Sequence, residues 1–474
     1  MLRKSLTLIG CAAALYTAQA QTGGLDAKLK VAYQRFAAQE NLRYASVGFL
    51  VQDENGKTIF ASGEQTGLAP ASCLKIVTAA TALDKLGTGY RFATQLQHSG
   101  SLTNGVLQGD LLVDGSGDPT MGSWRFSQQP DNAFFEQVLT MLRQKGINRI
   151  TGDVVGSNTR FGTQPVPNGW IYADMGNYYG AGSWALNYRE NQFDLSFNTS
   201  GAAGSKTSSS RSSMATGYDS IYSFVTVGAA GSGDNSIIYA APYSYTAYVN
   251  GTLGRQSAPF RISGSLPFGE LTLLEQLKQY LQANGIEVGG APRPALYYLL
   301  RQTTPPKATG SLGTYQSVGL DSTVYWFMQK SINLYGEALI RHLAMADGKP
   351  AETDAGAALV REYWAARGID RHALKPQDGS GLSPQNRVTA QALVQVLQYA
   401  RKQPWFSTYL HAFPLIHNIK MKSGTIGGAK GYTGYVQDKS GKQYSFALLV
   451  NNYSGNASAV VNDMFALLDT IVNN

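Results

Sequence analysis

One serine in this chain has a lysine three residues further along, in the stretch Ser72-Cys73-Leu74-Lys75. Residues three apart share one face of a helix, so the lysine amine can reach the serine hydroxyl. A serine is a poor nucleophile until a base takes its proton, and a lysine can do so only when its amine is neutral. Burial lowers a lysine pKa, and the apolar residues around Lys75 favour burial over a chance pair on a solvated helix. The pair predicts a nucleophilic serine with a lysine base.

Two further polar motifs follow along the chain. Ser331-Ile332-Asn333 lies in an otherwise apolar helical stretch, and Lys422-Ser423-Gly424-Thr425 precedes a glycine-rich segment and a strand. Neither pattern is unique, because look-alikes occur at Ser196-Phe197-Asn198, Ser454-Gly455-Asn456 and Lys439-Ser440-Gly441. The Lys439 copy falls between two strand patterns and is expected to be a solvated hairpin turn. Order and context therefore select Ser331, Asn333 and Lys422.

Hydrophobic periodicity predicts the elements that would position these residues. Helices are expected at 25–40, 74–86, 323–345, 355–367, 389–401 and 457–471, and strands at 44–51, 58–61, 431–437 and 443–451. Ser72 would then lie at or near a helix N-terminus. Because helices and strands occur at both ends of the chain, we expect one α/β domain built from residues 21–93 and 306–474.

The middle of the chain has a different pattern. Segments 94–190 and 266–305 mix strand-like runs with helical stretches, and are expected to form an inserted second domain. Residues 191–265 contain a Gly/Ser-rich run and then alternating strand patterns. That composition predicts a third, smaller, β-rich domain inserted within the second.

The first twenty residues have the pattern of an export signal. Arg3 and Lys4 precede a short apolar run, and Ala18-Gln19-Ala20 places small residues where a signal peptidase reads them. Cleavage after Ala20 would leave the protein in the periplasm; a lipoprotein site at Cys11 is the alternative. We expect no transmembrane anchor, because no later segment is long and apolar enough.

Composition argues against several other classes of function. The net charge of +8, which falls to +6 without the signal, suits an anionic envelope polymer. No Lys/Arg run is interleaved with aromatics, so nucleic acid is not an expected partner. The five histidines show no metal-ligand spacing, and no metal or other cofactor is expected. Cys73 would be the single cysteine of the exported chain, which leaves no internal disulfide.

The ordered motifs Ser72-x-x-Lys75, Ser331-x-Asn333 and Lys422-Ser423-Gly424 resemble those of the penicillin-binding proteins and serine β-lactamases. Ser72 and Ser331 are 259 positions apart, far more than a β-lactamase needs. The chain is therefore most similar to the D-Ala-D-Ala carboxypeptidase/endopeptidases of the penicillin-binding protein 4 (DacB) type. These form peptidase family S13, the class C low-molecular-mass penicillin-binding proteins. Other similar stretches are Pro70-Ala71-Ser72, Gly117-Asp118-Pro119, Ala185-Leu186-Asn187, Asp378 to Ser383 and Gly434-Tyr435-Val436.

The resemblance implies catalytic roles. Ser72 would form an acyl-enzyme with the penultimate D-Ala carbonyl, and Lys75 would be its general base. Ser331 would relay a proton towards the leaving amine, and Asn333 would hydrogen-bond the substrate amide. Lys422 would lie near Ser331 and help to keep Lys75 neutral by like-charge repulsion.

The resemblance also implies binding roles. Ser423, Gly424 and Thr425 would hold the terminal carboxylate, and the backbone N–H groups of Ser72 and Thr425 would form the oxyanion hole. Ser423 stands where the family usually has threonine, and it keeps the hydroxyl. The Asp378 to Ser383 segment is expected to be a structural, glycine-rich turn between helices.

The implied fold is a multi-domain α/β protein. A transpeptidase-type domain, an antiparallel sheet flanked by helices, would carry the two inserted domains. The implied substrates are peptidoglycan stem peptides that end in D-Ala-D-Ala or form D-Ala cross-links, and β-lactams would be covalent inhibitors. A serine β-lactamase and a non-catalytic peptidoglycan-binding scaffold are the alternatives. The balance of carboxypeptidase and endopeptidase activity and the oligomeric state are left open.

Overall fold

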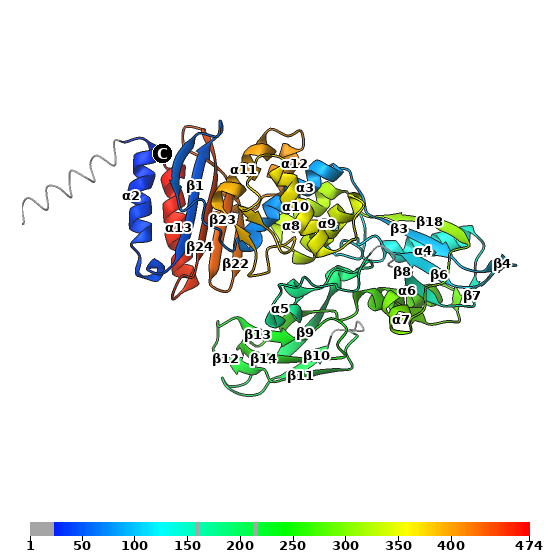
Figure 1. Ribbon diagram of the computed structural model, residues 1–474. Coiled ribbons are helices and arrows are strands. Elements are labelled where there is room, and N and C mark those ends of the chain that lie inside the picture. Colours follow the sequence, from blue (N-terminus) through cyan, green and yellow to red (C-terminus); the bar gives the residue numbers. More distant parts are fainter. Residues whose placement is uncertain (1–22, 158–160, 212–216) are drawn as a thin grey trace, which may run out of the picture. The chain divides into compact units, whose positions relative to one another are not determined.

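The computed structural model describes residues 23–157, 161–211 and 217–474 (Figure 1). The chain divides into two compact units. The first contains the chain up to Thr81, Arg361–Pro376 and Pro384–Asn474; the second contains Ala82–Val360 and Gln377–Ser383. The expected export signal at residues 1–20 lies outside the described residues, and the three-domain division stays a prediction.

An antiparallel six-stranded sheet forms the centre of the first unit. Its strands are β2 (Thr58–Ser62), β1 (Ser46–Asp53), β24 (Gln443–Asn451), β23 (Ala429–Gln437), β22 (Ile419–Ile426) and β21 (Leu415–Ile416), in that spatial order. Strands from the two ends of the chain therefore pair directly, β1 against β24. This confirms the expected antiparallel sheet assembled from both ends of the sequence.

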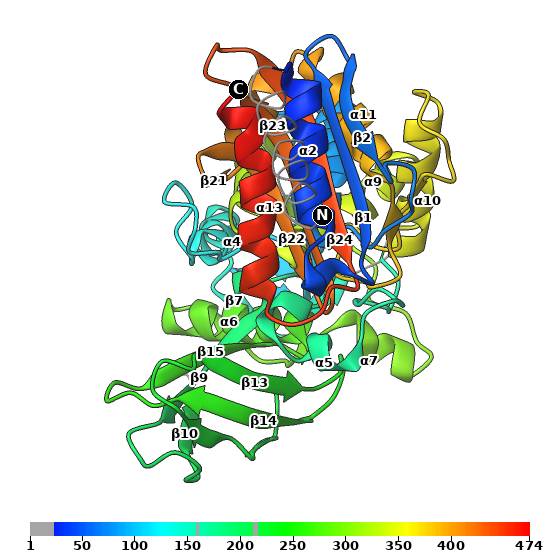
Figure 2. The same ribbon diagram turned by 90° about the vertical axis from the view of Figure 1, so that its left-hand side faces the viewer.

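Helices pack on this sheet because its central strands are apolar on both faces. Strand β24 is buried along almost its whole length. On one face, α2 (Leu25–Ala37) and α13 (Ala457–Val472) lie side by side (Figure 2), and their apolar residues share a core with β1 and β24. Helix α11 (Ala390–Arg401) packs against β24 and β1. The unit also contains α12 (Phe406–Ala412), β19 (Leu374–Lys375) and β20 (Arg387–Val388).

Two details of the first unit add to the expected pattern. The chain around Ser72 forms a short 3-10 turn, η2 (Ala71–Leu74), before α3 (Lys75–Leu86) begins. Lys422 precedes a glycine-rich turn and a strand, β23, as expected, but it also lies inside a strand of its own, β22, which was not expected. Ile419-Lys420-Met421-Lys422 alternates apolar and polar residues as a strand does, but the second half of β22, Ser423 to Thr425, has no large apolar residue.

The second unit contains two further sheets and their helices. One sheet has the order β17 (Pro292–Arg293), β8 (Val154–Ser157), β6 (Leu111–Asp114), β3 (Ala93–His98) and β18 (Gly310–Gln316). The other has the order β16 (Glu287–Val288), β7 (Arg149–Ile150), β5 (Val106–Gln108) and β4 (Ser101–Thr103). Helices α4 (Ala133–Gln144) and α6 (Gly269–Ala283) share a buried core with both sheets. Helix α7 (Ala295–Leu300) follows β17.

A β-rich part of the same unit covers most of residues 191–265. Strands β10 (Ser208–Arg211), β9 (Gln192–Asn198) and β15 (Phe260–Ser265) form one sheet. Strands β11 (Ser220–Ser223), β14 (Thr246–Gly254) and β12 (Thr226–Gly228) form another, with β13 (Asp234–Tyr239) also paired to β14. Both sheets contribute to one small apolar core. Helix α5 (Tyr172–Met175) packs against β13.

The single helix expected at 323–345 is wrong. Helix α8 (Leu320–Gln329) ends before Ser331, and α9 (Asn333–Ala346) begins after it. Ser331 has a φ of +57°, which a residue inside a right-handed helix cannot adopt. Apolar periodicity continues across the break, so hydropathy alone did not reveal it. Helix α10 (Thr353–Ala365) follows.

Among the described residues, none of the helices has the length and apolar character needed to cross a bilayer.

Candidate active site

Ser72 and Lys75 lie within hydrogen-bond distance of each other. The η2 turn leads directly into α3, so the two side chains project from consecutive turns on the same side. Lys75 Nζ donates to Ser72 Oγ over 2.9 Å. Lys75 is buried, whereas Ser72 remains partly exposed. A buried amine beside an accessible hydroxyl is the arrangement that general-base activation of a serine requires.

Strand β22 passes directly beside the Ser72 turn, and Gly424 permits this approach. A Cβ atom at position 424 would lie 2.6 Å from Pro70 O and 3.0 Å from the backbone nitrogens of Ser72 and Cys73. Any side chain there would push the strand away from the turn. The structure therefore brings the first and third motifs together within the first unit.

Lys422 lies on the same strand with its ammonium group buried. Its side chain is 2% exposed, and Nζ donates to Ser423 O over 2.8 Å. Burial lowers the pKa of Lys422 to about 8. Burial also raises the pKa of the Cys73 thiol to about 12, although the charges of Lys422 and Lys75 oppose this shift. Both lysines therefore act electrostatically on the same small region around Cys73.

The hairpin of β22 and β23 contains a lysine that the sequence analysis missed. Lys430 pairs with Thr425 across the hairpin, and its Nζ donates to Thr425 Oγ1 over 2.9 Å. Thr425 is exposed and Ser423 is partly exposed. The Gly427-Gly428 dipeptide is a recognisable hairpin turn. Counting outward from it would have placed Lys430 opposite Thr425.

Ser331 and Asn333 belong to the second unit, at the break between α8 and α9. Ser331 is partly exposed and adopts the left-handed backbone conformation noted above. Asn333 is the first residue of α9, and its Nδ2 donates to Tyr179 O over 2.8 Å. Tyr179 lies in the 3-10 turn η3 (Tyr178–Gly180). A segment distant in sequence therefore fixes the side chain of Asn333.

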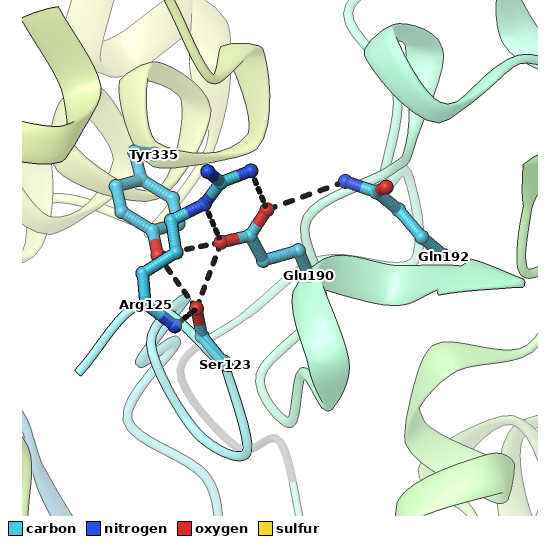
Figure 3. Close-up of polar contacts among 5 residues, drawn as sticks. All are labelled: Ser123, Arg125, Glu190, Gln192 and Tyr335. Atoms are coloured by element: carbon cyan, nitrogen blue, oxygen red, sulfur yellow. Dashed lines mark hydrogen bonds and ion pairs between the residues drawn. The ribbon is translucent and has the colours of Figure 1, made fainter. Parts of the chain in front are cut away.

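The first turn of α9 is also held by a buried carboxylate, Glu190 (Figure 3). Tyr335 OH donates to Glu190 Oε1 over 3.0 Å. Arg125 donates to both carboxylate oxygens, over 2.6 and 3.1 Å. Ser123 Oγ donates over 2.8 Å and Gln192 Nε2 over 3.3 Å. Five donor groups converge on Glu190, which therefore couples α9 to the chain at residues 123–125 and to its own segment, residues 190–192.

No sequence pattern pointed to Glu190. It sits in the 3-10 turn η4 (Arg189–Asn191), where all three residues have φ between +50° and +55°. This is the left-handed region that residues other than glycine rarely enter. Such a turn persists only when tertiary contacts hold it, and the Glu190 contacts are of that kind.

The Asp378 to Ser383 segment is a buried loop whose side chains bond to its own backbone. Asp378 accepts from the backbone nitrogens of Gly381 and Ser383, over 2.7 and 2.6 Å. Glu337 of α9 accepts from the Gly379 and Ser380 nitrogens, over 3.1 and 3.0 Å. Burial, followed by the charge of Asp378, raises the pKa of Glu337 to about 8. The segment thus has the structural character that was expected of it.

The look-alike motifs occupy ordinary structural positions. Lys439 is exposed in the turn between β23 and β24, where Asp438 Oδ1 accepts from the Ser440 and Lys442 nitrogens. The expected hairpin turn is confirmed. Asn456 caps α13 by accepting from the Ser458 nitrogen over 2.8 Å. Within the described ranges, no group of three or more His, Cys, Asp or Glu side chains could hold a metal ion.

Comparison with known proteins gives a consistent set of relatives. The model of the D-Ala-D-Ala carboxypeptidase 3 (S13) family matches residues 29–416. A D-alanyl-D-alanine carboxypeptidase of Actinomadura sp. (strain R39) is 26% identical over 98% of this chain and 87% of its own length. The D-alanyl-D-alanine carboxypeptidase DacB of Haemophilus influenzae is 25% identical over 86% of each chain.

The fold matches solved structures as well. Penicillin-binding protein 4 (dacB) from Haemophilus influenzae superposes with a TM-score of 0.78 at 22% identity, over 94% of this chain and 99% of that one. The same protein complexed with a β-lactam matches with a TM-score of 0.72. These matches confirm the expected fold class, a penicillin-binding domain with inserted domains.

Proposed function

The chain belongs to the D-Ala-D-Ala carboxypeptidase 3 (S13) family, a family of serine hydrolases, and from that premise we propose that Ser72 is its acyl-forming nucleophile. The observation that carries this proposal is the 2.9 Å contact between the buried Lys75 Nζ and the accessible Ser72 Oγ. The proposed reaction is hydrolysis of D-alanyl bonds in peptidoglycan stem peptides. The proposed location is the periplasm, after cleavage of the export signal at Ala20.

Acylation would proceed by transfer of one proton and exchange of one bond. Neutral Lys75 takes the proton of Ser72, and Ser72 Oγ attacks the carbonyl carbon of the penultimate D-Ala. The backbone N–H groups of Ser72 and Thr425 stabilise the oxyanion that forms. The C–N bond then breaks, and the departing D-Ala amine receives the proton through Ser331. Water releases the acyl group in a second step.

The other residues would prepare and orient this reaction. Lys422 disfavours a second positive charge on Lys75, because two like charges in one buried region repel each other. Asn333, fixed by its bond to Tyr179, hydrogen-bonds the substrate amide. Ser423, Gly424 and Thr425 hold the terminal carboxylate. Lys430, bonded to Thr425, adds a positive charge to this end of the site.

A fluorescent penicillin tests the nucleophile. It should label the wild-type protein, because a β-lactam presents a strained amide to the same serine. Ser72→Ala should abolish the labelling, while Ser440→Ala, in the look-alike turn, should label like the wild type. Labelling that persists in Ser72→Ala would overturn the assignment.

Two further measurements separate this function from its alternatives. Release of D-Ala from a D-Ala-D-Ala peptide, followed by mass analysis, should be catalytic and should depend on Ser72. If no D-Ala is released, the alternative of a non-catalytic scaffold is favoured. The penicilloyl adduct should decay slowly, whereas rapid release would identify a β-lactamase.

A further inference from the structure

Strands β11, β14 and β13 belong to one small sheet (Figure 1). Three tyrosines form a row across it. Tyr222 of β11 is directly opposite Tyr248 of β14 in a parallel pair. Tyr239 of β13 is opposite Tyr248 on its other side, in an antiparallel pair. Residues directly opposite each other project to the same face of a sheet. The row crosses two strand spacings, about 10 Å.

Within this row, Tyr239 and Tyr248 stack at 4.8 Å between ring centroids, with 14° between their planes. Two more rings, Tyr172 and Phe224, extend the row. Tyr172 of α5 packs on Tyr239 at 5.6 Å, and Phe224 packs edge-on against Tyr248 at 6.4 Å. We call these five residues, Tyr172, Tyr222, Phe224, Tyr239 and Tyr248, the aromatic face.

The aromatic face is open to solvent, although the opposite face of the same sheet is a core. Ile238, Ala247 and Val249 alternate with these rings along the strands and are buried. By contrast, Tyr222 is 57% and Phe224 64% exposed. A contiguous exposed apolar patch of this kind marks an interaction surface.

Charge narrows the class of partner. Strands β11, β13 and β14 contain no lysine or arginine, and Asp234 is their one charged residue. The exposed neighbours of Tyr248 along β14 are Thr246 and Asn250, which are polar and uncharged. An anionic lipid surface or a nucleic acid would need basic residues here. A stem peptide, with its carboxylates, would also lack a complementary charge.

We propose that the aromatic face binds the glycan strand of peptidoglycan. A sugar ring has a face of C–H groups that stacks on an aromatic ring, and hydroxyl and amide groups at its edge. The tyrosine hydroxyls, Thr246 and Asn250 offer uncharged hydrogen-bond partners for that edge. The identity of the polymer rests on the proposed function; the preference for an uncharged sugar chain rests on the surface itself.

The experiment measures co-sedimentation of the full chain with two insoluble polymers. Chitin provides a chain of N-acetylated sugars without peptide, and purified sacculi provide intact peptidoglycan. The variant Tyr222→Ala/Phe224→Ala removes the two most exposed rings and should weaken binding to both polymers by about tenfold, the order of one or two aromatic contacts. Tyr222→Phe keeps the ring and removes one hydroxyl, so it should bind more tightly than the double variant.

Controls separate this surface from the catalytic site and from misfolding. Tyr44→Ala removes a ring that is 72% exposed in the first unit, and binding should not change. The double variant should keep the wild-type rate of penicillin labelling and the wild-type circular dichroism spectrum.

Each other outcome counts against a specific statement. Failure of the wild-type protein to bind chitin, or equal binding by the double variant, would overturn the glycan proposal. Binding to sacculi but not to chitin would also overturn it and point to a peptide partner. If the wild-type protein binds chitin but is not labelled by penicillin, the proposed function is overturned and the glycan proposal is not.

Discussion

At the scale of single residues, the site depends on close approach of backbone to backbone. The Ser72–Lys75 contact is local, but it becomes part of a site only because β22 runs beside it. Gly424 is the residue on which that approach depends, since a Cβ atom there would meet three backbone atoms of the Ser72 turn. The glycine of the third motif therefore has a steric reason to be there.

Gly424→Ala should reduce the rate of penicillin acylation by about 100-fold, because a displacement of even 1 Å at a reacting centre has an effect of this order. Gly427→Ala is the matched control, because a Cβ atom at that position of the same hairpin meets nothing within 4 Å. The acylation rates are measured from the time course of labelling with fluorescent penicillin. Equal effects of the two substitutions would contradict the steric explanation.

The Cys73 thiol should resist alkylation in the folded protein. Burial raises its pKa to about 12, so at pH 8 only about one thiol in ten thousand is the reactive thiolate. Iodoacetamide should label Cys73 after unfolding in urea but not before, as read by mass spectrometry of the peptide. Rapid labelling of the native protein would mean that the turn opens readily.

At the scale of elements, the breaks and turns of the second unit position the second motif. The interruption between α8 and α9 exposes Ser331 at a helix junction. Asn333 and Tyr335, both in the first turn of α9, are bonded to the chain near residues 179 and 190. A hydrogen bond also joins the Gly117-Asp118-Pro119 and Ala185-Leu186-Asn187 segments, because Asn187 Nδ2 donates to Asp118 O over 3.2 Å.

Glu190→Ala should destabilise the protein by about 3–5 kcal/mol, because it leaves the largely buried Arg125 charge without its partner. Asp131→Asn is the control, since it breaks an exposed ion pair with the neighbouring Arg189 and should cost less than about 1 kcal/mol. Urea unfolding measures both. Similar small losses in the two variants would show that Glu190 does not anchor α9.

At the scale of the whole molecule, two compact units share one chain that crosses between them repeatedly. Ser72, Lys75 and Lys422 belong to the first unit, and Ser331 and Asn333 belong to the second. Unfolding of such a protein need not be a single transition. Stability is therefore best followed with probes placed in each unit.

The stability of the second unit should fall as the pH rises from about 4.5 to about 7. Glu270 of α6 is buried, and burial raises its pKa from 4.5 to about 7. The unfolded chain releases this proton at a lower pH than the folded chain, so the free energy of unfolding decreases through that interval, by about 3 kcal/mol. Glu270→Gln should remove this part of the decrease in urea unfolding at pH 5 and 7.5. Glu287→Gln, on an exposed carboxylate, should leave it unchanged.

The sequence by itself determined the Ser72–Lys75 pair, the helices and strands with clear periodicity, and the sheet built from both chain ends. These features are local, or they follow from apolar patterns that any packing must respect. The sequence also identified Lys439 as a turn residue, because the strands on either side of it have a clear apolar periodicity.

Tertiary structure alone decided the rest. The placement of β22 beside the Ser72 turn, the break at Ser331 and the left-handed turn at Glu190 all depend on residues far away in the sequence, so no local pattern reveals them. The burial that brings the pKa of Lys422 to about 8 and the exposure of the aromatic face have the same origin. Each depends on which strands become neighbours, and long-range packing makes that choice.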